Sequence, residues 1–421
     1  MKDIYAALDI GSATIKLLVG ETVSSNINVL FSKKIISHGI VKGKIEKMSA
    51  VVEDIKQLLA EAADVLGAPI TSVALCIPSL YARIYQSDGI TKVNSADDRI
   101  TNDDIIRALK LSKRFDRSSE EEIVSVIPIN YYLDTKVINK SPIGMKSASL
   151  KVESLIITTK KDYFYDYILA VEKAGLEVLE VTINSFACAK EAFDEVYLQE
   201  GAILIDIGFK SSTIAFFEDG YLKYIAQAPV GGYDLTKKIA ASWKIVLDKA
   251  EVYKVKYGTC DVEIGDEDII HTTKLKDEEV KYTQKDLAIE LEAGVREIME
   301  VIKTKIDVIN DGRNYETIIV GGGGELPMLD KVASEVLGCV VRSYRPETIG
   351  TRDMVFVSCL GMMYYMNDRN YILGKIEPSV VLSDISNTMG VRFKGLTKTK
   401  SNDDKSGGKF SRFLENIFSE D

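Results

Sequence analysis

Two short stretches of the chain carry the residue types that could bind phosphate. Residues 7–20 and 204–217 share one pattern: an apolar run, then Asp-Ile-Gly, then a few small or polar residues and a second apolar run. The pattern predicts a β-hairpin whose turn carries a carboxylate, a glycine and hydroxyl groups. Glycine lets the backbone approach a ligand closely, and consecutive N–H groups at a turn form a nest for an anion. Asp9 and Asp206 would hold a hydrated Mg²⁺ beside the phosphate.

The repetition of this pattern favours a ligand over a purely structural turn. Either stretch alone would also fit a strand that ends in an ordinary turn. Two copies about half a chain apart favour a duplicated domain that grips one ligand from both sides. A third stretch fits this picture, since four consecutive glycines at 321–324 lie between a strand pattern and a helical pattern. Such a run costs backbone entropy and is expected where a flat ligand lies against the main chain.

Three further groups of residues could contribute to the same chemistry. Gly231 and Gly232 form a diglycine turn that runs into a helical pattern, and a helix N-terminus is a natural anion site. Glu251 and Lys254 lie three residues apart, on one face of an expected helix. On an exposed face such a pair would be an ion pair that contributes little to stability. Asn184 lies where an expected strand meets an expected helix, so its side chain could also cap that helix.

The composition limits the classes of function. A length of 421 residues indicates two or three domains, and the net charge of −10 argues against a nucleic-acid-binding protein. The five cysteines are scattered, which suits a reducing cytoplasm without disulfides or a zinc site. The first residues enter a strand at once, and no apolar run reaches transmembrane length. The only two histidines, His38 and His271, make histidine catalysis improbable, and we expect both in loops or at the surface.

The elements expected around these turns indicate an α/β protein. Residues 1–80 are strand-rich with one amphipathic helix at 49–66, which is typical of helices packed on a mixed sheet. From about residue 81 to 158 the pattern changes to a short helix and several strands, which predicts an inserted α+β subdomain. That subdomain is either a structural elaboration or an interaction surface. A long helix is expected at 284–309, and residues 397–408 form a polar linker without core-forming residues.

The last residues of the sequence form one helical stripe. Its apolar members follow the spacing i, i+3, i+4, i+7 and i+8, and they are Phe410, Phe413, Leu414, Ile417 and Phe418. A helix this short is marginal in water, so its apolar face needs a membrane surface, a partner groove or the parent domain. The flexible linker before it disfavours the parent domain. Three phenylalanines beside Lys409 and Arg412 favour an interfacial membrane anchor. Nearby acidic residues make a single tail a weak binder, and polymerisation would raise its avidity by roughly 10²–10⁴.

The two Asp-Ile-Gly loops and the glycine loop, in this order, resemble the phosphate and adenosine loops of the actin, Hsp70 and sugar-kinase superfamily. Within it the sequence is similar to the bacterial cell-division family FtsA over nearly the whole chain. Further similar stretches are residues 38–43, 141–145, 229–232 and 249–258. The resemblance implies an actin-like two-domain α/β fold with a central nucleotide cleft, duplicated αβ domains, an inserted subdomain called 1C and a C-terminal amphipathic helix.

The resemblance also implies subdomain boundaries. Subdomain 1A would comprise residues 1–80, 159–198 and 351–395, interrupted by 1C at 81–158. Subdomain 2A would comprise 199–232 and 314–350, interrupted by 2B at 233–313. A flexible linker at 396–408 would lead to the membrane-targeting helix at 409–421.

The cofactors that the resemblance implies are ATP and Mg²⁺. Asp9 and Asp206 would hold the metal through water, and Lys16 would be a charge partner. The residues around the phosphates would be Gly11, Ser12, Ala13 and Thr14 on one side and Gly208, Ser211, Ser212 and Thr213 on the other. The rest of the nucleotide would meet Gly231, Gly232, Glu251, Lys254, Gly321, Gly322, Gly323 and Gly324.

Two positions limit how far the family pattern carries over. Asn184 stands where the family positions a water; an amide can orient water but cannot act as a base, so hydrolysis would be slow at best. Phe209 and Lys210 stand where the family continues with glycines. Either Phe209 would crowd the γ-phosphate and lower the affinity for the nucleotide, or Lys210 would compensate for the missing glycines.

The function that the resemblance implies is cell division. The protein would polymerise on the cytoplasmic face of the membrane at the division septum and tether filaments of the tubulin-like protein FtsZ. FtsZ would bind through its C-terminal peptide to subdomain 2B, and other division proteins would bind to 1C. One alternative is the related pilus-assembly actin homologue, which binds a membrane protein's cytoplasmic peptide. The other is a small-molecule kinase, although no catalytic aspartate facing a substrate pocket marks one.

Overall fold

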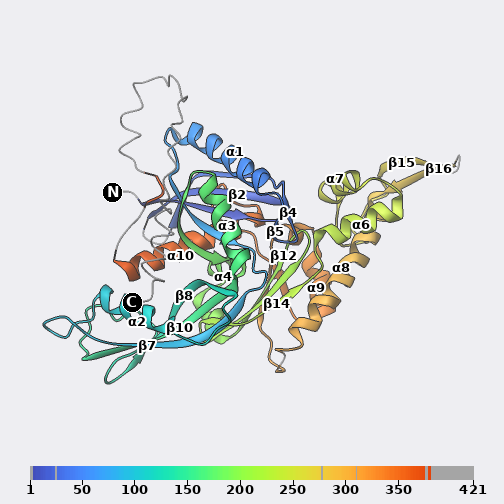
Figure 1. The fold of residues 1–421 in the computed structure, drawn as a ribbon. Coiled ribbons are helices and arrows are strands. Elements are labelled where there is room, and N and C mark those ends of the chain that lie inside the picture. Colours follow the sequence, from blue (N-terminus) through green and yellow to red (C-terminus); the bar gives the residue numbers. More distant parts are fainter. Residues whose placement is uncertain (1–2, 24–25, 276–277, 310, 375–377, 381–421) are drawn as a thin grey trace, which may run out of the picture. The chain divides into compact units, whose positions relative to one another are not determined.

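The computed structural model describes residues 3–23, 26–275, 278–309, 311–374 and 378–380. The chain divides into two compact units, whose elements are shown in Figure 1. The first unit is Met1–Ala187, Thr348–Gly350 and Ser358–Asp421, and the second is Cys188–Glu347 and Thr351–Val357. Each unit contains a five-stranded mixed sheet with helices, so the predicted α/β class is confirmed.

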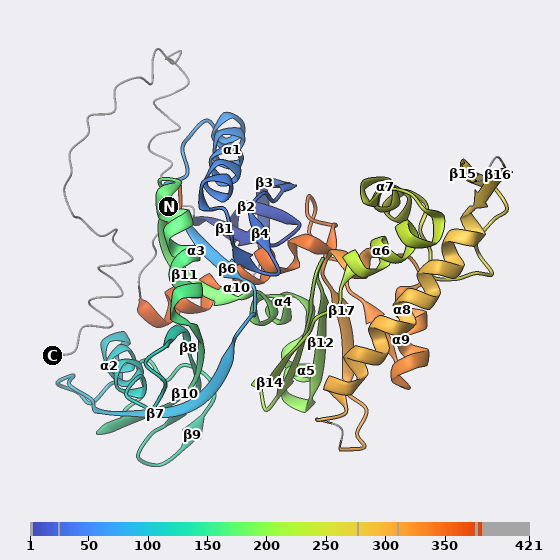
Figure 2. The ribbon, with the colours of Figure 1, turned by 45° about the vertical axis from the view of Figure 1, so that its right-hand side comes forward.

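The sheet of the first unit has the order β11-β6-β1-β2-β3. Its strands are β1 (Asp3–Ile10), β2 (Thr14–Val23), β3 (Asn26–Ile36), β6 (Ser72–Ile77) and β11 (Glu177–Ile183). Strand β1 is antiparallel to β2 and parallel to β6. Every residue of β6 is buried, which is expected when both faces of a sheet are covered. In Figure 2, α1 (Met48–Leu66) and α10 (Val357–Leu373) lie on opposite sides of these strands.

The helices of the first unit begin and end for identifiable reasons. Helix α1 ends at Gly67, which adopts the left-handed conformation that glycine takes readily at a helix end. Helix α3 (Lys161–Lys173) packs against α1 and β11, and α4 (Asn184–Ala192) follows β11 directly. Helix α10 approaches α4 at Gly361, where a Cβ atom would lie 1.7 Å from Ala187 O. Only glycine permits this contact between the two backbones.

The chain returns to the first sheet after α10. Ser379 donates from its N–H to Ile4 O at 2.8 Å, and its Oγ accepts from Ala6 N at 3.0 Å. Ser379 is fully buried. The last described residues therefore lie beside the start of β1, at the opposite end of that strand from Gly11.

The residues between β6 and α3 build a sheet of their own. Its order is β7-β10-β8-β9, formed by β7 (Arg83–Lys92), β8 (Glu121–Tyr132), β9 (Val137–Ile138) and β10 (Ser149–Lys160). Helix α2 (Asn102–Ser112) packs against β7 and β10 and begins with a capping box at Thr101 and Asp104. Gly89 allows the close approach, because a Cβ atom there would lie 1.8 Å from Ala108 O. The predicted inserted α+β layer is therefore present.

The sheet of the second unit repeats the first. Its order β14-β13-β12-β17-β18 comes from β12 (Ala202–Ile207), β13 (Ser212–Glu218), β14 (Tyr221–Ala228), β17 (Glu316–Val320) and β18 (Val341–Ser343). Strands β12, β13 and β14 form an antiparallel meander, as β1, β2 and β3 do. Strand β12 is parallel to β17, as β1 is to β6. The predicted duplication is thus visible in strand order and direction.

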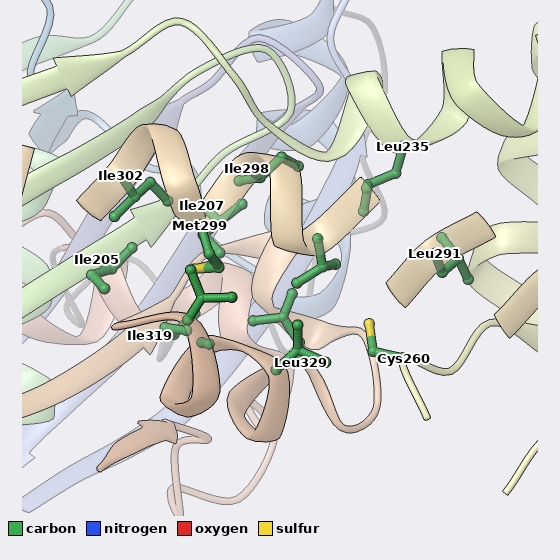
Figure 3. Close-up of a cluster of buried hydrophobic side chains, with 14 of the residues drawn as sticks. Ile205, Ile207, Leu235, Cys260, Leu291, Ile298, Met299, Ile302, Ile319 and Leu329 are labelled. Atoms are coloured by element: carbon green, nitrogen blue, oxygen red, sulfur yellow. The ribbon is translucent and has the colours of Figure 1, made fainter. Parts of the chain in front are cut away.

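One helix organises the core of the second unit. Helix α8 (Gln284–Ile306) begins with a capping box at Thr283 and ends earlier than the predicted Ile309. Its apolar side packs against the sheet, α6 (Gly232–Trp243) and α9 (Leu329–Leu337), and Figure 3 shows this cluster around Ile298 and Met299. Other elements of this unit are α5 (Glu195–Glu200), α7 (Leu247–Tyr257) and the 3₁₀ turns η1 (Gly322–Glu325) and η2 (Met354–Phe356).

A separate hairpin corrects one expectation. Strands β15 (Ile269–Leu275) and β16 (Glu278–Thr283) pair only with each other. His271, expected in a loop or at the surface, is buried in β15 and stacks with Trp243 and Tyr282. The expectation is correct for His38, which is exposed and contacts Asp54.

Candidate functional site

The first Asp-Ile-Gly turn, residues 9–14, joins β1 to β2. Gly11 N–H donates to Thr14 O at 3.1 Å and closes the turn. A Cβ atom on Gly11 would lie 3.1 Å from both Thr14 O and Lys16 Nζ, so the glycine keeps the turn tight. Ala13 O accepts from Ser37 N at 2.9 Å, which ties the turn to the end of β3.

Asp9 is a buried carboxylate with partners already in place. Its Oδ2 accepts from Lys16 Nζ at 3.1 Å and from Ser358 Oγ at 2.5 Å. Lys16 lies opposite Asp9 in the β1–β2 register, so the predicted charge partner is adjacent by strand pairing. One cation and one hydroxyl offset the cost of burying this charge. Ser358 comes from α10, and no spacing in the sequence points to it.

The second Asp-Ile-Gly turn, residues 206–211, closes with the same bond. Gly208 N–H donates to Ser211 O at 3.1 Å. Ser212 Oγ donates to Val230 O at 2.8 Å, and Thr213 Oγ1 accepts from Gln227 Nε2 at 2.9 Å. These two hydroxyls therefore anchor β13 to the segment around β14, whereas Ser211 lies in the turn itself.

Four of the predicted glycines meet at the second turn. A Cβ atom on Gly231 would lie 2.5 Å from Gly208 O, and one on Gly321 would lie 2.3 Å from Asp206 Oδ1. One on Gly323 would lie 2.5 Å from Ile207 Cγ2. Three chain segments thus come together here because Gly231, Gly321 and Gly323 carry no side chain. The sequence predicts these glycines at parts of a nucleotide, and their close packing against the second turn supplies a second reason for them.

The first N–H groups of α6 are committed to the second turn. Gly232 N donates to Gly208 O at 3.0 Å, and Tyr233 N donates to Phe209 O at 2.7 Å. The Phe209 ring lies 5.1 Å from the Tyr233 ring, and Lys210 Nζ lies 5.6 Å from the Tyr233 ring centre. The side chain of Phe209 therefore packs on the first turn of α6.

Glu251 and Lys254 lie on α7, and their side chains bind the first turn of α6. Lys254 Nζ donates to Gly232 O and Thr236 Oγ1, each at 2.9 Å, and to Glu251 Oε2 at 2.7 Å. All three N–H bonds of the ammonium are used, and Lys254 is buried rather than part of an exposed pair. Burial lowers the pKa of Lys254, and Glu251 opposes that shift. The same Glu251 oxygen accepts from Thr236.

Each unit therefore presents the same chemical group. A single carboxylate stands at the end of the central strand, beside a glycine turn with hydroxyls. A single carboxylate of this kind suits a hydrated cation better than it suits a cage of direct ligands. Among the residues that the structure describes, no cluster of three or more His, Cys, Asp or Glu side chains could hold a metal.

Comparison with known proteins gives the family. A model described as cell division protein FtsA matches residues 203–361, and one described as type IV pilus assembly protein PilM matches residues 7–261. The cell division protein FtsA of Bacillus subtilis (strain 168) is 27% identical over 86% of this chain and 83% of its own length. That of Enterococcus hirae is 27% identical over 89% of this chain and 86% of its own length.

The chain belongs to the FtsA family. The PilM model covers more than half of the chain, so the chain also belongs to the family that this model describes. Two solved structures share the fold at low sequence identity. The PilM-PilN type IV pilus biogenesis complex has a TM-score of 0.58 at 16% identity, covering 86% of this chain and 98% of that chain. MreB5 of Spiroplasma citri bound to ADP has a TM-score of 0.55 at 12% identity, covering 89% of this chain and 99% of that chain.

Asn184 has a structural task in this FtsA-family chain. Its Oδ1 accepts from Ser79 N at 3.1 Å and from Ser79 Oγ at 2.7 Å. It is the first residue of α4, and the N–H of Ser185 donates to Ser79 Oγ at 3.3 Å. The side chain thus joins the end of β6 to the start of α4. A water-positioning role for Asn184 stays a prediction.

Some predictions fall outside the described residues, and some contacts were missed. The membrane stripe of Phe410, Phe413, Leu414, Ile417 and Phe418 and the linker at 396–408 lie outside the part of the chain that the structure describes. No helix within that part is long and apolar enough to cross a membrane. The sequence did not predict the hydrogen bond from Ser358 to Asp9 or the one from Gly43 to Ser12. Only the resemblance of residues 38–43 to the family pointed toward Gly43.

Proposed function

We propose that this FtsA-family chain binds ATP with Mg²⁺, polymerises on the cytoplasmic face of the membrane and tethers FtsZ filaments there at the division septum. The observation that carries the nucleotide part is the matched pair of Asp-Ile-Gly turns. Gly11–Thr14 and Gly208–Ser211 close with the same 3.1 Å bond on equivalent strands of two duplicated sheets. Glycine turns of this kind suit the binding of phosphate.

Each turn supplies defined groups to the nucleotide. Mg²⁺ neutralises phosphate charge when bound, and Asp9 and Asp206 are the carboxylates that would orient its waters. Ser12 and the backbone of the first turn would bind phosphate oxygens, as would Ser211 in the second. Lys254 is saturated by its own contacts and would position the start of α6, which leaves Glu251 as the group for the sugar hydroxyls.

Hydrolysis would be slow in this proposal. Asn184 can orient a water but cannot accept its proton at neutral pH. Its carbonyl oxygen already accepts two hydrogen bonds from Ser79. ATP would then act mainly as a ligand that stabilises the assembled form.

Membrane attachment rests on the apolar stripe from Phe410 to Phe418. A single short helix with nearby acidic residues binds a bilayer weakly, so attachment would depend on many tails in one polymer. Subdomain 2B at 233–313 is the proposed surface for the FtsZ C-terminal peptide, and subdomain 1C at 81–158 for other division proteins.

Liposome flotation tests this proposal. We would compare the full chain with a version ending at Gly408, each with and without ATP·Mg²⁺, and with FtsZ added in a parallel series. Phe413→Glu breaks the stripe without removing the tail, and Glu415→Gln is the matched control beside it. The membrane anchor is supported if the full chain and Glu415→Gln float while Phe413→Glu and the version ending at Gly408 do not. The tether is supported if FtsZ floats only together with the full chain or Glu415→Gln.

A pilus-type function is the second candidate, because the PilM model covers residues 7–261 and the PilM–PilN complex shares the fold. In that case the chain would bind the cytoplasmic peptide of a membrane protein and would not need its own anchor. Failure of the full chain to float under every condition would favour this function over the tether.

A further inference from the structure

Gly43 lies at a junction of three segments of the first unit. It follows Lys42 in the turn between β4 (Ile40–Val41) and β5 (Lys44–Ile45), and both turn residues have positive φ, 50° and 76°. Such φ values belong to the tight two-residue hairpin turn. Gly43 N–H donates to Ser12 Oγ at 2.8 Å, and Gly43 O accepts from Tyr167 Oη at 2.8 Å. Both polar groups of this buried glycine are therefore fixed, one by the first Asp-Ile-Gly turn and one by α3.

The bond from Gly43 uses Ser12 Oγ as an acceptor and leaves its proton available for donation. A hydroxyl has one proton to donate and two lone pairs to accept with. Because Ser12 Oγ accepts from Gly43, its own proton is free to be given to an anion in the turn. A donated proton makes the oxygen a better acceptor, so an anion on Ser12 would strengthen the bond from Gly43.

Tyr167 holds Gly43 from a fully buried position. It lies on α3, and its ring is 5.1 Å from that of Tyr163, one turn earlier on the same helix. Tyr163 Oη donates to Pro78 O at 3.0 Å. The two tyrosines thus place two backbone carbonyls, Gly43 O and Pro78 O, at fixed positions along one helix.

Pro78 begins the connection into the inserted subdomain. Leu80 packs over Gly43, with Leu80 Cδ2 3.5 Å from where a Cβ atom of that glycine would lie. Thr159 Oγ1, at the end of β10, donates to Leu80 O at 3.0 Å, so the strands that enter and leave the subdomain are joined here. Tyr81 adopts a left-handed φ of 62° and lies edge-on to Tyr163 at 5.7 Å. A bulky residue in that conformation is strained and is held by its surroundings.

We propose that Gly43, Tyr167 and Tyr163 couple anion binding at the first Asp-Ile-Gly turn to the root of the inserted subdomain, with Tyr167 as the positioning residue for Ser12. The inference rests on the proposed function, because the anion is the phosphate chain of a nucleotide. Phosphate on Ser12 tightens the β4–β5 turn, which holds Leu80 and, through α3, Pro78. A partner on the inserted subdomain then changes nucleotide affinity, and nucleotide changes partner affinity by the same factor.

Hydrogen–deuterium exchange of the full chain with and without ATP·Mg²⁺ tests this coupling. Three segments are followed: 9–16, 39–47 and 78–85. In the wild type, ATP slows exchange in all three. Tyr167→Phe removes only the hydroxyl on Gly43; it should weaken ATP binding roughly three- to ten-fold and remove the ATP effect at 78–85 while keeping it at 9–16. Tyr163→Phe should also remove the effect at 78–85, but it should weaken ATP binding less than Tyr167→Phe does, because it leaves the bond on Gly43 intact.

Tyr165→Phe is the matched control. It lies on α3 between the two tyrosines, and its hydroxyl donates to Glu122, outside the route. This variant should behave as the wild type does in every segment and in ATP affinity.

Three outcomes overturn the inference. If ATP protects 9–16 in the wild type but leaves 78–85 unchanged, the coupling is absent while nucleotide binding stands. If Tyr167→Phe speeds exchange equally with and without ATP and keeps the ATP effect at 78–85, Tyr167 is only structural. If ATP protects no segment at saturating concentration, the nucleotide proposal itself fails and the coupling with it.

Discussion

At the scale of single residues, the two Asp-Ile-Gly turns carry one carboxylate each, Asp9 and Asp206, and different groups surround the two. Asp9 is compensated by Lys16 and Ser358, whereas Asp206 lies against the backbone of Gly321. Strand pairing makes Lys16 predictable from the sequence, because the residues flanking a hairpin turn face each other. Ser358 was not predictable, because it reaches Asp9 across almost the whole chain and only the packing of α10 brings it there.

Asp206 gives a prediction about magnesium. Asp206→Asn removes the charge that would orient the waters of Mg²⁺ but keeps the shape of the side chain. We expect ATP affinity in Mg²⁺ to fall at least about ten-fold, by analogy with other outer-shell partners of metals, while affinity in EDTA stays as it is. Fluorescent-nucleotide titration with and without Mg²⁺ measures both.

Asp219→Asn is the control for this measurement, because it is exposed in the β13–β14 turn of the same sheet and Asn tolerates its positive φ. An equal loss of affinity in EDTA would show that Asp206 supports the fold rather than the metal.

Glu191 gives a prediction about pH. Burial raises the pKa of Glu191 to about 7, and the hydrogen bond from Tyr344 opposes the shift. A carboxyl group with a raised pKa favours the folded state when protonated, so its contribution is lost as pH rises from about 4.5 through 7. Glu191→Gln, which stays neutral, should therefore be more stable than the wild type at pH 8, by about 1–3 kcal/mol, and nearly equal at pH 5.

Thermal unfolding of the full chain at the two pH values measures this difference. Glu200→Gln, an exposed carboxylate a few residues away on α5, is the control and should shift neither value. A wild type as stable as Glu191→Gln at pH 8 would contradict the assigned pKa.

At the scale of elements, what is local was predictable and what is brought together by packing was not. The two Asp-Ile-Gly hairpins, the capping boxes at Thr101 and Thr283 and the end of α1 at Gly67 all follow from residues within a few positions. The contacts among the second turn, Gly231 and Gly323 join three distant segments, and the glycines alone did not reveal that backbone would fill the space. The burial of His271 depends likewise on stacking against α6, which its own strand does not encode.

The glycine loop gives a prediction about the stability of variants at two adjacent glycines, Gly322 and Gly323. A methyl group on Gly323 would meet Ile207 Cγ2 at 2.5 Å and Ile207 O at 2.8 Å, whereas one on Gly322 would meet only Val355 Cγ1 at 3.2 Å. Gly323→Ala should lower the free energy of unfolding by about 1–3 kcal/mol, because the backbone of β12 cannot move aside easily. Gly322→Ala should cost less, since a terminal methyl can shift.

Urea unfolding of the two variants in the absence of nucleotide measures this difference. The comparison separates packing from ligand contact, because no ligand is present. Equal stability of the two variants would mean that the loop yields to the extra methyl, and the close approach would not explain the glycine at 323.

At the scale of the whole molecule, the proposed function depends on assembly rather than on any single strong contact. The tail at 409–421 carries five apolar residues in its predicted stripe and acidic residues beside it, so we expect one copy to have little affinity for a bilayer. Flotation of the full chain should therefore fall steeply, not in proportion, when protein is diluted below the concentration at which it assembles. A monomeric fluorescent protein that carries only residues 396–421 should float weakly, and a tandem dimer of the same fusion should bind with an avidity roughly 10²–10⁴ higher. Strong flotation of the monomeric fusion would show that the tail needs no polymer, and membrane attachment would then not report assembly.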